Sequence, residues 1–188
     1  RAAVAAGARL LCVLNASPFH LGKAEEREQR MGERARAVGR PLVYTQLVGG
    51  QDEVVFDGAS FALDAAGVVR ARAAAFAEEL LLLELDDDGT PSGALAPLPP
   101  LEAQAWRALV VGVRDYLGKN GFPGAIVGLS GGMDSALVLA VAVDALGAER
   151  VRAVMMPSPY TADISWLDAR DMAARLGVRY DEIAIAPM

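Results

Sequence analysis

Cysteine, histidine and aromatic residues are scarce in this chain. Its 188 residues include one cysteine (Cys12), one histidine (His20) and only 6% aromatic residues. A single cysteine excludes a disulfide bond within the chain and is typical of a reducing compartment. We therefore expect a cytoplasmic protein.

Long apolar runs and an excess of positive charge are missing as well. No apolar run approaches the roughly 20 residues that span a bilayer, so we expect no membrane partner. The formal net charge is −6, which argues against a general nucleic-acid-binding surface. An acidic protein can still bind ATP, because backbone N–H groups and Mg²⁺ supply positive charge locally.

The chain is rich in apolar residues, which make up 53% of it, whereas 22% are charged. This composition is typical of a globular protein with one or two domains. Residue 1 is arginine, and Met188 directly follows a predicted core strand. We therefore expect the chain to be an internal fragment of a longer protein.

The stretch Ala125–Leu137 organises the second half of the chain. A short apolar run predicts a buried parallel strand, Ser130-Gly131-Gly132 interrupts it, and a second apolar run predicts a helix that ends before Gly147. Backbone N–H groups at a helix start are unpaired and lie at the positive end of the helix dipole, and glycine lets an anion approach them closely. The stretch therefore predicts a phosphate-binding loop.

The spacing Ser-Gly-Gly-x-Asp-Ser resembles the pyrophosphate loop of the ATP pyrophosphatase family. It is not a Walker A loop, because no Gly-Lys-Ser/Thr follows, and it lacks the Gly-x-Gly-x-x-Gly of dinucleotide folds. The resemblance implies that the loop holds the β- and γ-phosphates of ATP, that Asp134 helps to hold Mg²⁺, and that two serines contact phosphate. The ATP-binding residues that it implies are Gly128, Leu129, Ser130, Gly131, Gly132, Met133, Asp134, Ser135 and Met155. The alternative is an ordinary strand–helix turn in which Asp134 and Ser135 only cap the helix.

A second ligand-binding segment is expected after the next predicted strand, Arg150–Met156. Pro157–Asp163 follows the carboxyl end of that strand, where open α/β sheets bind ligands, and it resembles the adenine-lining segment of the same family. Met155 and Met156 could contact adenine or fill the core, and we expect one of them to fill the core. Ala162 replaces the last serine of the family segment, which removes a hydroxyl contact.

The other elements of this half alternate between helix and strand, which predicts right-handed crossovers and a parallel sheet. A helix over Leu101–Lys119 is expected to bury Trp106, Leu109, Val110, Val113 and Leu117. A helix over Trp166–Leu176 is expected to be capped by Ser165. The last predicted strand is Val178–Ile185.

The first half is predicted to contain a strand, a helix, a strand and then several short strands, which indicates an α/β sandwich. The helix is expected over residues 24–38 and turns over 49–53 and 65–67. The predicted strands are 8–14, 41–48, 54–57, 59–64, 68–75 and 80–85.

This half resembles the nitrilase, or carbon–nitrogen hydrolase, fold and in particular the glutaminase domain of glutamine-dependent NAD⁺ synthetases. The match rests on Leu14–His20 with Lys23 downstream and on Val48–Phe61. It implies glutamine hydrolysis by a Glu-Lys-Cys triad with Cys as the nucleophile, and it implies that Ser17 and Lys23 bind glutamine. A turn residue and a solvated lysine are the alternatives for these two. In the family the triad precedes this segment, so we expect no catalytic residue within this chain.

For three other residues of this half we expect no role in catalysis or substrate binding. Cys12 lies inside an apolar strand and is predicted to be a core residue. His20 is predicted to be a structural loop residue, because no cysteine or aspartate is suitably placed beside it. Gln46 stands where the family usually has asparagine, so we expect no substrate contact from it.

The predicted domains are residues 1–85, the C-terminal part of a nitrilase-like glutaminase domain, and 100–188, the N-terminal part of an ATP-binding domain with a parallel sheet. Residues 86–99 are polar and contain glycine and proline, which predicts a linker. Together the two parts resemble glutamine-dependent NAD⁺ synthetases.

That resemblance implies ATP-dependent amidation of deamido-NAD⁺ through an adenylated intermediate, with ammonia taken from glutamine. It also implies ATP and Mg²⁺ as cofactors and a homo-oligomer, with the fragment alone inactive. The alternatives are a pyrophosphate-loop amidoligase that acts on another acid, such as a purine nucleotide, and a non-catalytic nucleotide-binding module.

Overall fold

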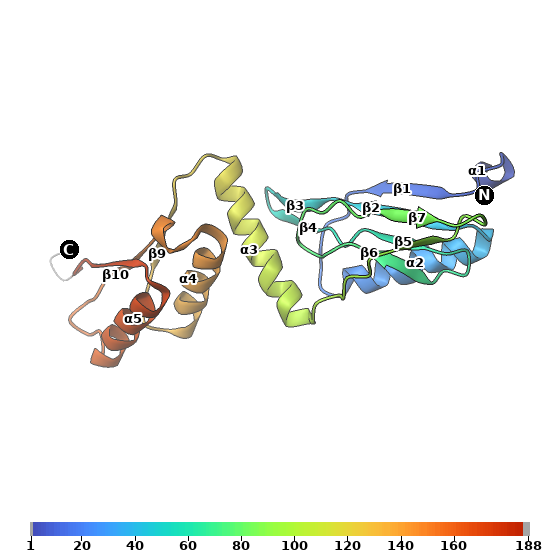
Figure 1. Cartoon of the computed structure of the whole chain (residues 1–188). Helices are drawn as coiled ribbons and strands as arrows, with labels where there is room; N and C mark the ends of the chain where they lie inside the picture. Colours follow the sequence, from blue (N-terminus) through green and yellow to red (C-terminus); the bar gives the residue numbers. More distant parts are fainter. Residues whose placement is uncertain (1, 186–188) are drawn as a thin grey trace. The chain divides into compact units, whose positions relative to one another are not determined.

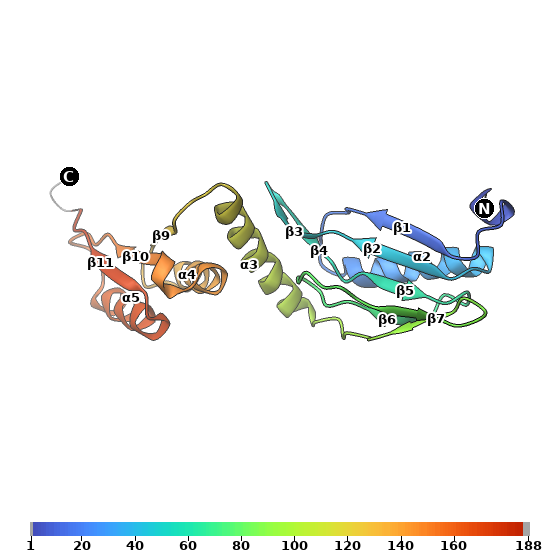
Figure 2. The ribbon, with the colours of Figure 1, turned by 45° about the horizontal axis from the view of Figure 1, so that its top comes forward.

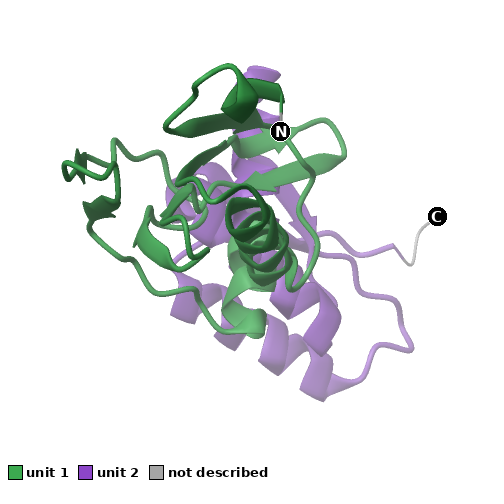
Figure 3. Ribbon diagram, turned by 90° about the vertical axis from the view of Figure 1, so that its right-hand side faces the viewer, with its two compact units in different colours: residues 1–108 green, residues 109–188 purple. Residues whose placement is uncertain are grey.

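The chain divides into two compact units in a computed structural model that describes residues 2–185 (Figure 1). The units comprise residues 1–108 and 109–188 (Figure 3). Helix α3 (Leu101–Lys119) has the predicted limits, and it begins in the first unit and ends in the second. The predicted domain limits of 1–85, 86–99 and 100–188 stay a prediction.

The first unit is built on a four-stranded sheet of order β1-β2-β5-β6, in which only the β1–β2 pair is parallel. Its strands are β1 (Leu11–Asn15), β2 (Leu42–Gln46), β5 (Phe61–Leu63) and β6 (Val69–Arg72). Two hairpins are added, β3 (Val48–Gln51) with β4 (Val54–Asp57), and β7 (Leu83–Leu85) with β8 (Pro91–Gly93). Its helices are α1 (Ala2–Ala5) and α2 (Lys23–Val38).

Helix α2 covers one face of this sheet (Figure 2). Acidic residues in its first turn complement the helix dipole, and Gly39 ends it in the left-handed conformation with a φ of 60°. The core between helix and sheet consists of Met31, Ala35, Leu42, Tyr44, Phe61 and Leu63. The predicted strand–helix–strand start of an α/β sandwich is therefore confirmed.

The prediction that Cys12 is a core residue is wrong, because Cys12 is exposed. Side chains alternate along β1, and Leu11 and Val13 are the ones that pack against the α2 side of the sheet. Cys12 and Leu14 therefore lie on the opposite face, where Leu14 is 85% exposed. An apolar run identifies a strand, but it does not tell which faces are covered.

Two further predictions for this unit need correction. The strand expected over 41–48 ends at Gln46, and Val48 begins a separate strand. The turn expected over 49–53 is shorter, because Gly49–Gln51 pair with β4 and only Asp52 and Glu53 form the turn. Residues 86–90 form the turn of the β7–β8 hairpin, so this part of the predicted linker belongs to a paired structure.

The second unit is a three-stranded sheet of order β11-β10-β9, and it is parallel as predicted. Its strands are β9 (Ala125–Gly128), β10 (Val151–Met155) and β11 (Arg179–Glu182), so the last strand is shorter than the predicted 178–185. Residues 186–188 lie outside the described part of the chain. The helices are α4 (Met133–Leu146), a 3₁₀ turn (Ala148–Arg150) and α5 (Asp163–Leu176).

The core of this unit lies between the sheet and helices α4 and α5, and it includes Leu139, Ala153 and Ala169, none of them exposed. Val110, Val113 and Leu117 of α3 pack against it, as the helical spacing predicts. Leu109 does not share their environment, since it is 52% exposed. None of the described helices is both long and apolar enough to cross a bilayer.

The prediction that Ser165 caps helix α5 is wrong. The helix begins at Asp163 with Ala162 as its N-cap, and no side chain makes a capping hydrogen bond. Ser165 lies in the first turn instead, where its N–H donates to the carbonyl of Ala162. The Ser-x-x-Asp pattern identified a helix start, but the helix begins three residues earlier than predicted, at Asp163 instead of Trp166.

Candidate functional site

The predicted phosphate loop lies directly after the carboxyl end of β9. Leu129 N–H donates to Val154 O at 2.9 Å, which continues the parallel pairing with β10 by one step. The chain then leaves the sheet over Ser130–Gly132 and enters α4 at Met133. The loop therefore occupies the sheet edge at which open α/β sheets bind ligands.

Two serines shape this loop through their hydroxyl groups. Ser135 Oγ accepts from Ser130 N–H at 3.2 Å and donates to Gly132 O at 3.0 Å, and the two hydroxyls lie 3.1 Å apart. Gly132 N–H in turn donates to Ser130 Oγ at 3.3 Å. The serines thus brace the loop from its two ends.

Several backbone N–H groups of the loop remain available to a ligand. Among the described residues, no protein acceptor pairs with the amides of Gly131, Met133 and Asp134. They lie at the N-terminus of α4, where the helix dipole is positive. This arrangement can bind the oxygens of a phosphate group.

Gly131 is required by the conformation of the loop. Its φ is 79°, and a Cβ at this position would lie 2.3 Å from the backbone oxygen of Ser165 in α5. Only glycine therefore lets the loop pass so close to α5. Gly132, by contrast, has an extended φ of −88°, and its Cβ would meet Ser130 Oγ at 3.4 Å.

Asp134 lies in the first turn of α4 with its side chain exposed. Within the described part of the chain it has no ion-pair or hydrogen-bond partner. The alternative of simple helix capping is wrong, since Gly132 is the N-cap and no side chain caps it. An exposed carboxylate beside unpaired amides suits a hard divalent cation that bridges to phosphate.

A hollow of about 250 Å³ lies between the ends of β9 and β10. Met155 lines it and is only 2% exposed, and its sulfur accepts from Tyr180 OH at 3.4 Å. Burial raises the pKa of Tyr180, so this hydroxyl keeps its proton. Met155 is thus the methionine that fills the core, whereas Met156 is 56% exposed at the mouth. The hollow is lined by Gly128, Leu129, Ser130, Val154, Met155, Met156 and Thr161.

The residues expected to bind glutamine, Ser17 and Lys23, flank the connection between β1 and α2. Ser17 is tied to the end of β2, because Gln46 Nε2 donates to Ser17 O at 2.7 Å. Lys23 begins α2 with a side chain that is 23% exposed, and its Nζ lies 3.9 Å from Glu26 Oε2. Lys23 is therefore neither buried nor fully solvated.

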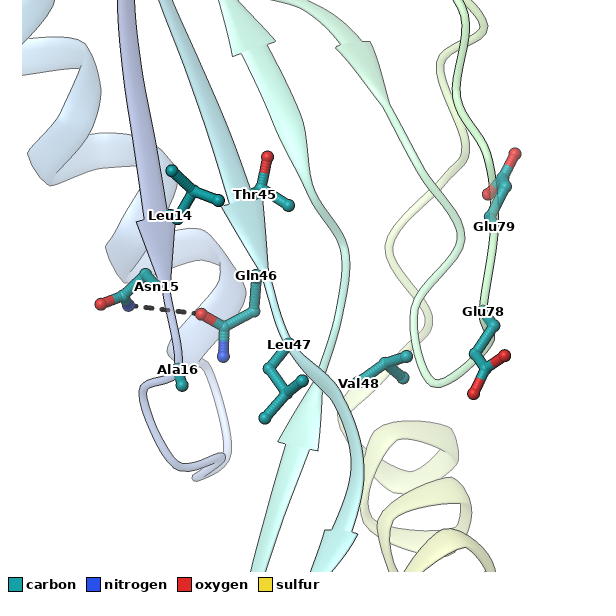
Figure 4. Close-up of a pocket in the computed structure, with 9 residues that line it drawn as sticks. All are labelled: Leu14, Asn15, Ala16, Thr45, Gln46, Leu47, Val48, Glu78 and Glu79. Carbon is teal, nitrogen blue, oxygen red and sulfur yellow. Dashed lines mark hydrogen bonds between the residues drawn. The ribbon is translucent and has the colours of Figure 1, made fainter.

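A second, larger hollow of about 660 Å³ lies beside the ends of β1 and β2 (Figure 4). Asn15 and Gln46 lie at its wall and are joined by a hydrogen bond of 3.3 Å. The other lining residues are Leu14, Ala16, Thr45, Leu47, Val48, Glu78 and Glu79. All of these lining residues belong to the first unit.

His20 lies in the loop before α2, as predicted. Its Nδ1 lies 3.0 Å from Leu21 O, and its Nε2 lies 3.4 Å from Glu26 Oε2.

Sequence reasoning missed two buried polar features of the first unit, the amide of Gln46 and the ion pair of Arg27 with Asp57. Nothing in their sequence spacing indicates that they meet other segments.

Known proteins are similar to nearly the whole of this chain. A family profile for NAD synthase matches residues 105–188. A glutamine-dependent NAD(+) synthetase from Xylella fastidiosa is 47% identical over 98% of this chain, and one from Thermotoga maritima is 37% identical over 92%. These matches cover 35% and 36% of the two relatives, so the chain spans about a third of their length.

A solved structure gives the same result. The glutamine-dependent NAD+ synthetase of Acinetobacter baumannii, determined with adenosine diphosphate, is 42% identical and superposes with a TM-score of 0.93. The match covers 99% of this chain and 36% of that one. A synthetase of the same kind from Cytophaga hutchinsonii, at 20% identity and a TM-score of 0.78, shares the fold.

Proposed function

The chain belongs to the glutamine-dependent NAD(+) synthetase family, and on that premise we propose that the protein amidates deamido-NAD⁺ to NAD⁺ with ATP and glutamine-derived ammonia. The observation that carries this proposal is the loop Ser130–Ser135, whose unpaired amides lie at the start of α4. Because the chain spans about a third of its relatives, the whole reaction is a proposal for the intact protein.

In the ATP-dependent step, the amides of Gly131, Met133 and Asp134 bind the β- and γ-phosphates. The nicotinate carboxylate of deamido-NAD⁺ attacks the α-phosphorus of ATP, and pyrophosphate leaves. The loop amides stabilise the charge that grows on this leaving group, because they are already oriented toward it. Ammonia then attacks the adenylated carboxyl carbon, AMP leaves and the amide forms.

The residues present fit a magnesium ion at one place. Asp134 offers an exposed carboxylate without a partner among the described residues, next to the amides that would hold phosphate. When bound, Mg²⁺ would supply positive charge that offsets the negative charge of the phosphates. Ser130 and Ser135 keep the loop in shape for both ligands.

For the glutaminase step we assign Ser17 and Lys23 to the binding of glutamine. The family resemblance places the Glu-Lys-Cys triad outside the matched segment, and the exposed Cys12 in the middle of β1 is not offered as a nucleophile. The same resemblance supports a homo-oligomer, and the single cysteine supports a reducing cytoplasm.

The test is Asp134→Ala in the intact protein. We expect it to abolish NAD⁺ synthesis with either glutamine or ammonia and to leave glutamine hydrolysis in place, because Asp134 lies in the second unit and serves only the ATP-dependent step. Glu102→Ala is the matched control, since Glu102 is also an exposed acidic residue in the first turn of a helix. Retained ammonia-dependent synthesis in Asp134→Ala would exclude this role.

The same assay addresses the remaining alternatives. Mass spectrometry of the products formed from ATP, ammonia and either deamido-NAD⁺ or a purine nucleotide acid identifies the acid that is amidated. A titration with Mg-ATP that shows binding, combined with no product from any acid, would instead favour a nucleotide-binding module.

A further inference from the structure

The side chain of Gln46 holds the backbone of Ser17 by both of its polar groups. Gln46 Nε2 donates to Ser17 O at 2.7 Å, and Gln46 Oε1 accepts from Ser17 N–H at 3.4 Å. Gln46 ends β2 and is only 5% exposed, opposite Asn15 at the end of β1. We call this arrangement of Gln46 and Ser17 the amide clamp.

The amide clamp is itself fixed by neighbouring strands. Gln46 N–H donates to Ser60 Oγ at 3.0 Å, and Gln46 Oε1 also accepts from Asn15 Nδ2 at 3.3 Å. Asn15 Nδ2 donates in addition to Tyr44 OH, and the Tyr44 ring stacks on Phe61 with centroids 5.0 Å apart. The amide of Gln46 therefore has a defined orientation, with both its oxygen and its nitrogen in use.

The hydroxyl of Ser17 is the polar group that the clamp leaves unused. Ser17 Oγ is shielded from solvent and has no hydrogen-bond partner among the described residues. A buried hydroxyl without a partner is unfavourable, so it is expected where a ligand or another group completes the pairing. The clamp thus satisfies the backbone of Ser17 and leaves its side chain for another molecule or segment.

We propose that Gln46 is a positioning residue for glutamine hydrolysis. It acts through Ser17, by fixing that residue's backbone so that rotation of the side chain brings the hydroxyl, which is shielded in this structure, to the bound glutamine. This inference rests on the proposed function, which assigns Ser17 to glutamine. It agrees with the expectation that Gln46 makes no substrate contact: Gln46 touches no substrate itself, but it sets the position of a residue that does.

The test is Gln46→Glu in the intact protein. The substitution keeps the shape but replaces the Nε2 donor by an oxygen that faces Ser17 O, so the clamp is lost. We expect the KM for glutamine to rise at least about tenfold, the effect of losing one well-placed hydrogen bond that fixes a binding residue. Ammonia-dependent synthesis should stay within twofold of the unmodified protein, because it bypasses glutamine.

Two further variants make the test specific. Gln51→Glu is the matched control: the same chemical change on an exposed side chain of β3, for which we expect an unchanged KM. Gln46→Met has nearly the same length without a charge, and it should raise the KM similarly. If Gln46→Glu fails to fold, Gln46→Met carries the test.

A double-mutant cycle with Ser17→Ala separates positioning from general damage. If Gln46 acts through the Ser17 hydroxyl, Gln46→Met has little further effect on the KM for glutamine once Ser17 is alanine. Full additivity, or an unchanged KM in both Gln46 variants, overturns the inference. Absence of ammonia-dependent synthesis in the unmodified protein would instead contradict the proposed function.

Discussion

Arg27 and Asp57 form a buried ion pair, and the two residues are 4% and 2% exposed. Two hydrogen bonds of 2.7 and 2.6 Å join them, so the pair ties helix α2 to the end of β4. Such a pair adds little stability compared with well-packed apolar residues, but it becomes costly when one partner is removed. At the scale of single residues, the stability of the first unit is therefore sensitive to the loss of either partner of this pair.

We predict that Asp57→Ala lowers the free energy of unfolding by about 3–5 kcal/mol, because it leaves Arg27 buried without a counter-charge. Urea unfolding followed by circular dichroism measures the loss. Arg175→Gln is the control: it breaks the exposed pair with Asp171 and should cost less than about 1 kcal/mol. A loss for Asp57→Ala no greater than for the control would contradict the prediction.

A second prediction concerns Asp64 and pH. Burial raises the pKa of Asp64, but the hydrogen bond from Val68 N–H at 2.9 Å and the Arg70 guanidinium at 2.7 Å outweigh it, so the pKa is lowered overall. The unfolded state therefore binds the proton more tightly, and the stabilisation is present above the ordinary aspartate pKa of about 3.9. It is lost as the pH falls through the lower folded-state pKa.

The measurement is the difference in unfolding midpoint between the unmodified protein and Asp64→Asn, from pH 7 down to pH 3. We expect this difference to be constant near neutral pH and to shrink below about pH 4. A difference that grows as the pH falls would show that the pKa of Asp64 is raised instead.

At the scale of elements, strand β9, the loop over Ser130–Gly132 and helix α4 together form the proposed phosphate-binding site. The strand positions the loop at the sheet edge, the helix provides unpaired amides, and Gly131 lets the loop pass against α5. Ser165 does not cap α5, contrary to the prediction. Its backbone oxygen is instead the atom with which a Cβ at Gly131 would clash. The glycine of the motif is therefore required by the packing of the loop against α5, in addition to the phosphate binding that we propose.

We predict that Gly131→Ala weakens Mg-ATP binding at least about tenfold, because the left-handed φ of 79° and the contact with Ser165 force the loop to move. Isothermal titration calorimetry with the intact protein measures the change. The control is Gly118→Ala in α3, where an added Cβ meets nothing within 4 Å. It should leave binding unchanged and add about 0.5–1 kcal/mol of stability; equal binding by Gly131→Ala would contradict the proposed loop.

At the scale of the whole molecule, the cores of the two units share no buried residue within the part of the chain that the structure describes. The core of the second unit centres on Leu139, which has no exposed surface, whereas that of the first includes Phe61 and Leu63. Each unit thus buries its own apolar surface, which is the requirement for a separate unit of folding.

We predict that Leu139→Ala destabilises the second unit by about 2–5 kcal/mol through loss of buried surface and the cavity that remains. Hydrogen exchange read by mass spectrometry should show faster exchange in residues 109–188 and little change in 1–108. Leu137→Ala on the same helix is the control, because Leu137 is 53% exposed. Faster exchange throughout the chain would show that the two cores unfold together.

The sequence by itself determined the order of helices and strands in the second unit and the place of the loop that we propose binds phosphate. Local patterns sufficed there: the apolar run before Ser130, the glycines after it, and the spacing of Val110, Val113 and Leu117 all depend on neighbours a few residues away. The family resemblance of both halves also came from contiguous residues, and the comparisons confirmed it.

Only the tertiary structure decided which faces are covered and which distant groups meet. Cys12 is exposed because α2 covers the other face of β1, and Gln46 meets Ser17 because β1 and β2 pair in parallel with Asn15 opposite Gln46. These contacts join residues about 30 positions apart in sequence, and no local propensity encodes them. They arise when strands pair and a helix packs on one side, because side-chain surroundings are set by the neighbours that folding brings together.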